Sequence, residues 1–191
     1  MGVGSGTVLA MLGAIGVDRL FGVDIDPEAL AATTNLMTRA GLIDRTDLRL
    51  GSLWEPLSNE RIDIIAANLP QFAATEPSDP EHSPYWSFAG PDGRRFMDPF
   101  LAGLRDHMTD SAFAFITHNR FLGMDRTEAL LRQTGLAARE VLTTAVLLHP
   151  LKAALLQPEI RSNIESAGII QFGPYEFIEV QILEIRPRGS V

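Results

Sequence analysis

Hydrophobic and polar positions follow two rhythms along the chain. Short runs rich in β-branched and aromatic residues predict buried strands, and longer runs with apolar residues every three or four positions predict helices. The strands are predicted at 19–23, 47–50, 62–67, 112–117, 140–148 and 176–185. The helices are predicted at 7–15, 27–40, 93–108, 126–134 and 151–157. Strands that alternate with helices are typical of a mainly parallel sheet with crossover helices, so the predicted fold class is α/β.

Two segments depart from this rhythm. The segment 68–92 is rich in proline and aromatic residues, and loops of that length are usually functional or without fixed structure. After residue 148 a polar stretch leads to the last strand, which we expect to form an antiparallel hairpin with the strand at 140–148 at one edge of the sheet. No repeat or linker divides the chain, so we expect one domain over residues 1–191.

Composition narrows the class of partner. The chain has 191 residues, a net charge of -8 and no cysteine. The acidic balance disfavours nucleic acid as a partner, because it gives no broad attraction to phosphate. The absence of cysteine fits a reducing compartment, and we expect a cytoplasmic protein. No apolar run reaches the length of a membrane span, and the histidines show no metal-ligand spacing, so we predict neither a membrane segment nor a metal site.

A glycine-rich turn, Gly2-Val3-Gly4-Ser5-Gly6, precedes the first predicted helix. Glycines let the backbone turn tightly and approach a ligand, and the start of a helix offers free N–H groups with a partial positive charge. Asp24 ends the next strand, 18 residues beyond Gly6. This is near the spacing at which an acid binds ribose hydroxyls in dinucleotide folds. The alternative is that Asp24 only caps the helix at 27–40, although Asp26 is better placed for that role.

A second candidate site, Asn68-Leu69-Pro70-Gln71, follows the strand at 62–67. Open α/β sheets bind their ligands at the carboxyl ends of strands. A carboxamide oxygen and a backbone carbonyl can hold N–H groups of a substrate and tolerate positive charge that develops on nitrogen. The alternative is an ordinary turn, since Asn-x-Pro is common in turns.

The glycine loop followed by Val23-Asp-Ile-Asp-Pro-Glu-Ala-Leu30 resembles class I S-adenosylmethionine-dependent methyltransferases. The resemblance implies a Rossmann-like fold with S-adenosylmethionine as cofactor, held by residues that include Gly2, Gly4, Gly6, Asp24, Ile25 and Asn68. Where the family usually has an acid for the adenine amino group, this chain has Ser52, so Ser52 or the backbone of Leu53 is expected to make that contact. Trp54 is expected either to border the adenine or to pack in the core.

The segment Asn68-Leu69-Pro70-Gln71 resembles the Asn-Pro-Pro-Tyr motif of enzymes that methylate amines and amides, among which the release-factor glutamine methyltransferases are the most similar over the whole chain. The resemblance implies that Asn68 and the Leu69 carbonyl accept hydrogen bonds from the target N–H groups. Gln71 stands where the family has an aromatic platform, and Phe72 is a candidate replacement. Tyr85 to Gly93 resembles the family segment before the next helix.

The expected function is therefore methyl transfer from S-adenosylmethionine to the nitrogen of an amine or amide, in a small molecule or a protein side chain. The catalytic residues are expected to be Asn68, Leu69, Pro70 and Gln71. Two alternatives stay open: a reaction directed at oxygen or sulfur or another S-adenosylmethionine reaction, and a non-catalytic binding subunit. His118 follows a strand and is expected to act as a general base or to be an ordinary loop histidine. Arg94 and Arg95 are expected to lie on a solvated face, with Asp92 as a helix cap.

The start of the glycine loop adds one more expectation. Members of the resembled family place a buried strand ahead of the loop, at the centre of the sheet, whereas only Met1 precedes the loop here. We expect two unpaired sheet edges, beside the strands that end at Asp24 and Ala67. A longer natural chain, a partner or a second copy is expected to supply the strand.

Overall fold

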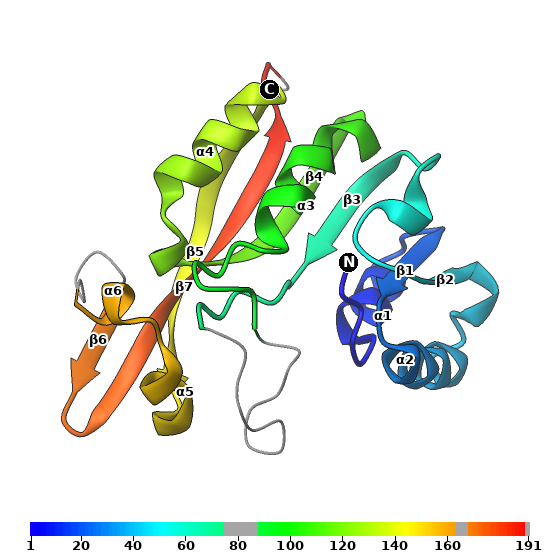
Figure 1. Cartoon of the computed structure of the whole chain (residues 1–191). Helices are drawn as coiled ribbons and strands as arrows, with labels where there is room; N and C mark the ends of the chain where they lie inside the picture. Colours follow the sequence, from blue (N-terminus) through cyan, green and yellow to red (C-terminus); the bar gives the residue numbers. More distant parts are fainter. Residues whose placement is uncertain (75–87, 163–167, 190–191) are drawn as a thin grey trace.

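The computed structural model describes residues 1–74, 88–162 and 168–189 (Figure 1). The strands are β1 (Leu20–Asp24), β2 (Thr46–Leu50), β3 (Ile62–Ala67), β4 (Met108–Asn119), β5 (Leu136–Leu148), β6 (Ile169–Phe172) and β7 (Tyr175–Pro187). The α-helices are α1 (Thr7–Ala14), α2 (Pro27–Arg39), α3 (Met97–Leu104), α4 (Met124–Gln133), α5 (Pro150–Leu155) and α6 (Pro158–Arg161). Short 3-10 turns are η1 (Ile43–Arg45), η2 (Glu55–Leu57), η4 (Arg105–His107) and η5 (Arg120–Leu122).

The larger of two sheets has five strands. Four of them follow the order β3-β4-β7-β5, and β6 pairs with the part of β7 that does not pair with β4. β3 and β4 are parallel, whereas β7 runs antiparallel to β4, β5 and β6. The helices α3 and α4 cover one face of this sheet (Figure 1), and their buried side chains include Phe100, Leu101, Leu104 and Leu131. The predicted α/β class, with parallel strands first and antiparallel strands at the carboxyl end, is confirmed.

The smaller sheet consists of β1 and β2, which pair in parallel and pack against α1 and α2. The start of α2 follows from local chemistry: Pro27 occupies its first turn, and the Asp26 carboxylate accepts a hydrogen bond from the Glu28 N–H at 2.8 Å. Gly41 ends this segment at a φ of +68°, which favours glycine. The core of the unit is small, with Leu9, Leu20, Met37 and Leu42 as its buried members.

A gap separates the two sheets. Within the described residues no strand lies between β1 and β3, and the amino terminus sits at that point (Figure 1). The Met1 amine donates to the Ala66 carbonyl of β3 at 2.9 Å, and the Val3 N–H donates to the Val23 carbonyl of β1 at 3.1 Å. Residues 1–3 therefore join the carboxyl ends of two strands whose facing edges are otherwise unpaired.

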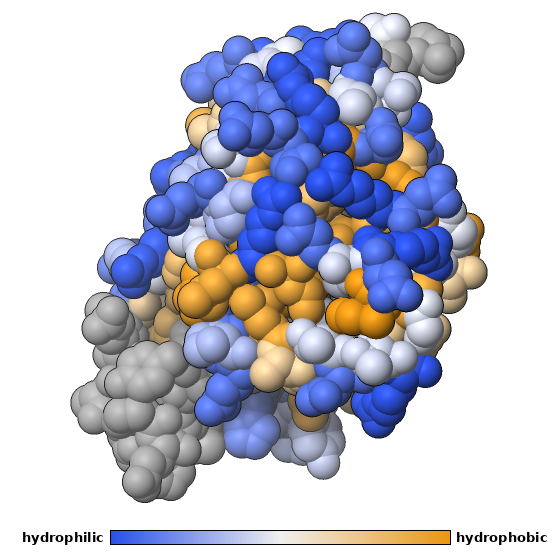
Figure 2. Space-filling model, turned by 90° about the vertical axis from the view of Figure 1, so that its right-hand side faces the viewer, coloured by the Kyte–Doolittle hydropathy of each residue, from blue (hydrophilic) through white to orange (hydrophobic). Residues whose placement is uncertain are grey.

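A cavity of about 270 Å³ fills this gap, and most of its lining is apolar. Most of the lining residues belong to α1, β1, β3 and β4. They include Val8, Leu12, Phe21, Ile64 and Phe115. Figure 2 shows apolar atoms reaching the surface on the side of the molecule that carries β1 and β2. Val8 and Met11 of α1, and Ile15 directly after it, are among the exposed apolar residues of this unit. The expectation of two unpaired sheet edges agrees with this arrangement.

Most predicted elements match those of the structure at their start or end. The predicted strands at 19–23, 47–50 and 62–67 agree with β1, β2 and β3 to within one residue. β4 and β5 are longer than predicted, and β6 and α6 were not predicted. β7 does not lie at a sheet edge: it lies inside the sheet, between β4 and β5. The resembled segment at Tyr85–Ser87 lies outside the described residues.

The predicted helix at 93–108 is longer than the helix in the structure, and the predicted solvation of Arg94 was wrong. α3 begins at Met97 and ends at Leu104, and Gly93 adopts a φ of +72°, which does not occur in a right-handed helix. Asp92 accepts a hydrogen bond from the Arg94 N–H in the turn before it instead of capping the helix. The Arg94 side chain is 3% exposed.

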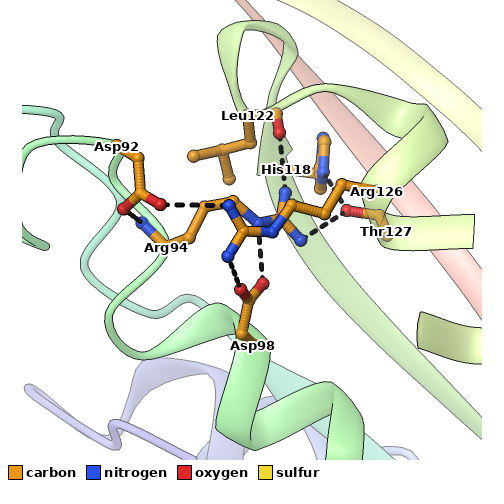
Figure 3. Close-up of polar contacts among 7 residues, drawn as sticks. All are labelled: Asp92, Arg94, Asp98, His118, Leu122, Arg126 and Thr127. Carbon is orange, nitrogen blue, oxygen red and sulfur yellow. Dashed lines mark hydrogen bonds and ion pairs between the residues drawn. The ribbon is translucent and has the colours of Figure 1, made fainter. Parts of the chain in front are cut away.

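Arg94 occupies a polar pocket between α3, η5 and α4 (Figure 3). Its guanidinium donates to the Asp98 carboxylate at 2.6 Å, to the Leu122 carbonyl at 2.7 Å and to the Thr127 hydroxyl at 3.1 Å. Arg126 pairs with the other oxygen of Asp98. A buried charge of this kind is tolerated because it is both paired and hydrogen-bonded. Arg94 thus ties the segment before α3 to η5 and α4.

The expectation for Trp54 is resolved by its packing. Trp54 is 9% exposed, stacks on Phe100 and His107, and donates its indole N–H to the Phe100 carbonyl at 2.9 Å, so it packs in the core. Among the described residues, no helix is long and apolar enough to cross a membrane.

Candidate cofactor and acceptor site

The glycine loop and the end of β1 are tied together by the Asp24 carboxylate. Its Oδ2 accepts a hydrogen bond from the Gly4 N–H at 2.9 Å, and its Oδ1 accepts one from the Asp26 N–H at 3.1 Å. Each carboxylate oxygen keeps a further lone pair, and the residue is only partly buried. Asp24 therefore organises the loop and can still accept hydrogen bonds from a ligand. Its role is larger than that of a helix cap, which Asp26 supplies.

The conformation of the loop favours glycine at three positions. Gly2, Gly4 and Gly6 have φ values of +64°, +51° and +79°. A Cβ at Gly6 would lie 2.9 Å from the Thr33 side chain, and the Thr33 hydroxyl donates to the Gly4 carbonyl at 3.0 Å. A Cβ at Gly4 would meet no atom within 4 Å, so the backbone there faces open space. Thr33 of α2 is a supporting residue that the sequence pattern did not reveal.

The loop after β2 lies against the same region. The Gly51 N–H donates to the Asp24 carbonyl at 2.9 Å, which places Ser52 and Leu53 beside the end of β1. Ser52 is exposed, and Leu53 has a φ of +47°, a strained value for a residue with a side chain. Ile25 is 64% exposed. The residues predicted to contact the nucleoside thus follow the carboxyl ends of neighbouring strands.

Asn68 lies at the end of β3, next to the glycine loop. A Cβ at Gly2 would lie 3.7 Å from the Asn68 carbonyl oxygen, so the two predicted halves of the site meet at this point. The Asn68 side chain is exposed, and its Oδ1 accepts a hydrogen bond from the Thr117 hydroxyl of β4 at 2.6 Å. The apolar cavity reaches Gly2, Asn68 and Thr117 but not Asp24, so it adjoins the site rather than forming its cofactor half.

The other three predicted catalytic residues are placed differently. The Leu69 side chain is 7% exposed and packs in the main core, while its carbonyl accepts a 3.3 Å hydrogen bond from Gln71. Pro70 is partly buried. The Gln71 side chain is 5% exposed and is turned toward β4. Asn68 is therefore the member of this segment whose side chain is presented at the surface.

Two side chains considered for the chemistry are buried elsewhere. Phe72 packs edge-to-face on Phe88 in a small core beneath α5, so it does not present a platform beside Asn68. His118 is 0% exposed, and its Nε2 lies 2.9 Å from the Thr127 hydroxyl. Burial lowers the pKa of His118 to about 4, and the Arg94 guanidinium acts in the same direction. His118 is thus a neutral core residue at neutral pH, which removes it as the general base.

The donor and acceptor set fits S-adenosylmethionine. Asp24 has lone pairs for two ribose hydroxyls, and the open backbone at Gly4 lies close to the start of α1, where a carboxylate is stabilised. Asn68 lies on the other side of Gly2, where a methyl acceptor can be held. The contacts within the chain keep these groups in place without using all their hydrogen-bonding capacity.

Comparisons with known proteins agree on the fold. No protein-family model matches the chain, and no curated protein matches it in sequence. Among solved structures, a proposed RNA methyltransferase from Pyrococcus horikoshii is similar, with a TM-score of 0.62, 18% identity and coverage of 98% of this chain and 72% of that one. Precorrin-6y C5,15-methyltransferase from Geobacter metallireducens is also similar, with a TM-score of 0.57 and 11% identity. The similarity covers 98% of this chain and 76% of that one.

Ribosomal protein L11 methylase from Lactobacillus delbrueckii subsp. bulgaricus is a third similar structure, with a TM-score of 0.54 and 13% identity. The similarity covers 94% of this chain but only 66% of the methylase, so the chain spans somewhat less than two thirds of that protein. These three structures differ in the acceptor that their names state, and no specific resemblance to release-factor enzymes emerges. What they share with this chain is the Rossmann-like methyltransferase fold.

Proposed function

We propose that the chain binds S-adenosylmethionine and transfers its methyl group to a nitrogen atom of an amine or amide. The observation that carries the proposal is the convergence of the glycine loop, Asp24 and Asn68 at the carboxyl ends of β1 and β3. The Rossmann-like methyltransferase fold supports the same cofactor, because open α/β sheets bind their ligands at this edge.

The cofactor supplies an electrophilic methyl group on a sulfonium, and the residues supply its orientation. Asp24 accepts hydrogen bonds from the ribose, and Ser52 or the backbone of Leu53 borders the adenine. Asn68 holds the acceptor, because its Oδ1 keeps one lone pair beside the bond from Thr117. Fixed acceptor oxygens also stabilise the positive charge that develops on a nitrogen during transfer.

The class of acceptor is open between a small molecule and a protein side chain. The net charge of -8 favours neutral or cationic acceptors over nucleic acid. The names of two similar structures include RNA and a ribosomal protein, so a short RNA belongs in the test beside an amide and an amine. A reaction at oxygen or sulfur and a purely binding role remain the competing functions.

The test is methyl transfer from radiolabelled S-adenosylmethionine to three probes: a glutamine-containing tripeptide, n-butylamine and a short single-stranded RNA. We expect transfer to the tripeptide or to the amine, and Asn68→Ala is expected to lower turnover at least tenfold with nearly unchanged cofactor affinity. Asn35→Ala is the matched control, because Asn35 is an exposed asparagine on α2. Unchanged turnover in Asn68→Ala removes Asn68 from the site, and labelled RNA alone contradicts the proposed acceptor.

We also propose that the apolar cavity between β1 and β3 accommodates one further extended strand. Within the described residues, residues 1–3 bond to β1 and β3 only near the carboxyl ends of the two strands, so the rest of both facing edges is open to backbone pairing. The apolar lining favours Val, Ile or Leu in such a strand.

A further inference from the structure

A row of side-chain hydrogen bonds connects β4 to the surface amide of Asn68. The Gln71 Nε2 lies 3.0 Å from the Thr117 hydroxyl and 2.9 Å from the Thr117 carbonyl. The Gln71 Oε1 accepts a hydrogen bond from the Asn119 N–H at 2.7 Å. The Thr117 hydroxyl in turn lies 2.6 Å from the Asn68 Oδ1. Gln71, Thr117 and Asn68 therefore form a continuous row of side-chain hydrogen bonds, and the Asn119 backbone N–H fixes Gln71 at the start of the row.

Donor and acceptor rules determine the direction of every bond in this row. The Asn119 N–H can only donate, so the Gln71 oxygen faces it and the Gln71 nitrogen faces Thr117. An amide nitrogen can only donate, so the Thr117 oxygen accepts from it, and the single hydroxyl proton is available for Asn68. The 2.6 Å separation from Asn68 is typical of O–H···O bonds and shorter than most N–H···O bonds.

The consequence is a single orientation of the Asn68 amide. Its Oδ1 points to Thr117, and its Nδ2 lies on the other branch of the side chain. An exposed asparagine on its own samples both orientations with similar energies, because the two ends of the amide differ only in their hydrogen bonding. The buried Gln71 and the strand residue Thr117 remove that freedom, since Gln71 is 5% exposed and Thr117 is paired with Ile182 of β7.

We propose that Thr117 and Gln71 are positioning residues, which orient the Asn68 amide for the methyl acceptor through this row of hydrogen bonds. The inference rests on the proposed function, because it assigns to Asn68 the contact with the acceptor. It also gives Gln71 a task other than contact with the substrate: all its polar atoms bond within the chain. These bonds are a physical reason for glutamine at position 71, where the resembled motif has an aromatic residue.

The chain contains a matched control for Thr117. Thr109 lies on the same strand, and its hydroxyl donates to the Asp63 carboxylate of β3 at 2.6 Å. Each threonine donates a hydroxyl hydrogen bond from β4 to a neighbouring side chain: Thr109 to Asp63 within β3, and Thr117 to Asn68 directly after β3. Thr109→Val removes such a bond far from Asn68, so it reports the general cost of losing it.

The experiment compares Thr117→Val, Thr117→Ser, Thr109→Val and Asn68→Ala in the methyl-transfer assay with the tripeptide or amine probe that the unaltered chain accepts. We expect Thr117→Val to lower kcat about tenfold while the dissociation constant for S-adenosylmethionine changes less than twofold. Thr117→Ser, which keeps the hydroxyl, is expected to restore kcat to within twofold. Thr109→Val is expected to leave kcat unchanged. The double variant Thr117→Val with Asn68→Ala is expected to be no slower than Asn68→Ala alone, because the two changes act through one group.

A second measurement does not depend on turnover. In NMR spectra of uniformly 15N-labelled protein, the Asn68 side-chain signals are expected to shift in Thr117→Val and to stay in place in Thr109→Val. If Asn68→Ala lowers kcat and Thr117→Val leaves both kcat and these signals unchanged, the positioning role is overturned. If Asn68→Ala itself leaves kcat unchanged, the proposed function fails at Asn68 instead, so the two failures are distinguishable.

Discussion

The β1–β2 unit and the five-stranded sheet are stabilised in different ways. The small unit has a core of four buried residues, and one edge of β1 faces the apolar cavity. The large sheet has a continuous core with α3 and α4 on it, reinforced by the buried Arg94 pocket. Val23 and Trp54 belong to the main core and form part of the apolar contact between the two units.

This contrast follows the division of the site. The glycine loop, Asp24 and Ser52 belong to the weakly supported unit, whereas Asn68 and Thr117 belong to the large sheet. Cofactor binding should therefore depend on how firmly β1 is held against β3. Acceptor binding should depend on bonds within the large sheet. The predictions that follow test this division, beginning with the largest effect.

Removal of the buried Arg94 charge should give the largest loss of stability, and this loss should fall on the five-stranded sheet. Arg94→Ala removes the donor of one Asp98 oxygen, while Arg126 still pairs with the other, and it leaves the Leu122 carbonyl without its donor. Loss of buried, charge-assisted hydrogen bonds of this kind costs about 3 kcal/mol. Urea unfolding followed by circular dichroism measures the change in the free energy of unfolding. Arg95→Ala is the neighbouring control, because Arg95 is exposed and most exposed changes cost less than about 0.5 kcal/mol.

A strand that fills the apolar cavity should stabilise the β1–β2 unit. A five-residue Val- and Ile-rich segment placed directly ahead of Met1 is expected to raise the free energy of unfolding, since its buried apolar side chains and its backbone hydrogen bonds to β1 and β3 together outweigh the cost of ordering the segment. Hydrogen exchange should slow at the amides of β1 and β3. A segment of equal length with two prolines is the control. Equal exchange rates with both segments would falsify the strand proposal.

Acid should weaken the large sheet through His118. Its pKa is about 4 in the folded chain and about 6.5 when unfolded, so the unfolded state binds more protons between these values. The stabilisation is complete above about pH 6.5 and declines as the pH falls toward 4, by about 2–3 kcal/mol. His118→Gln should abolish this part of the pH dependence in urea unfolding at pH 7 and pH 4.5. An identical pH dependence in the variant would assign it to other groups.

Local signals allowed much of the small unit and of the site edge to be predicted. Asp26 and Pro27 mark the start of α2, and the glycine loop with Asp24 marks the cofactor half. Asn68 was predicted from its place after a buried strand. Thr117 also ends a run of strand residues and could have been found by the same rule, but its bond to Asn68 depends on the pairing of β3 with β4.

The rest could not be predicted because it depends on distant partners. Arg94 and Arg95 look alike in the sequence, and the partners that bury Arg94 lie 28 and 33 residues away. β6 has only four residues and is stabilised as a strand by its pairing with β7. Gln71 interrupts a known motif, and its contacts with Thr117 and Asn119 become visible only in the folded sheet.

Isothermal titration with S-adenosylmethionine tests the central claim most directly. Asp24 stands at the carboxyl end of β1, and Asp18 is an exposed aspartate just ahead of the amino end of the same strand. The account predicts saturable binding by the unaltered chain and at least tenfold weaker binding by Asp24→Ala, because a charged hydrogen bond contributes about 1.5–3 kcal/mol. Asp18→Ala should bind within twofold of the unaltered chain. Absence of binding by the unaltered chain, or equal dissociation constants for all three proteins, would contradict the assignment of the cofactor site.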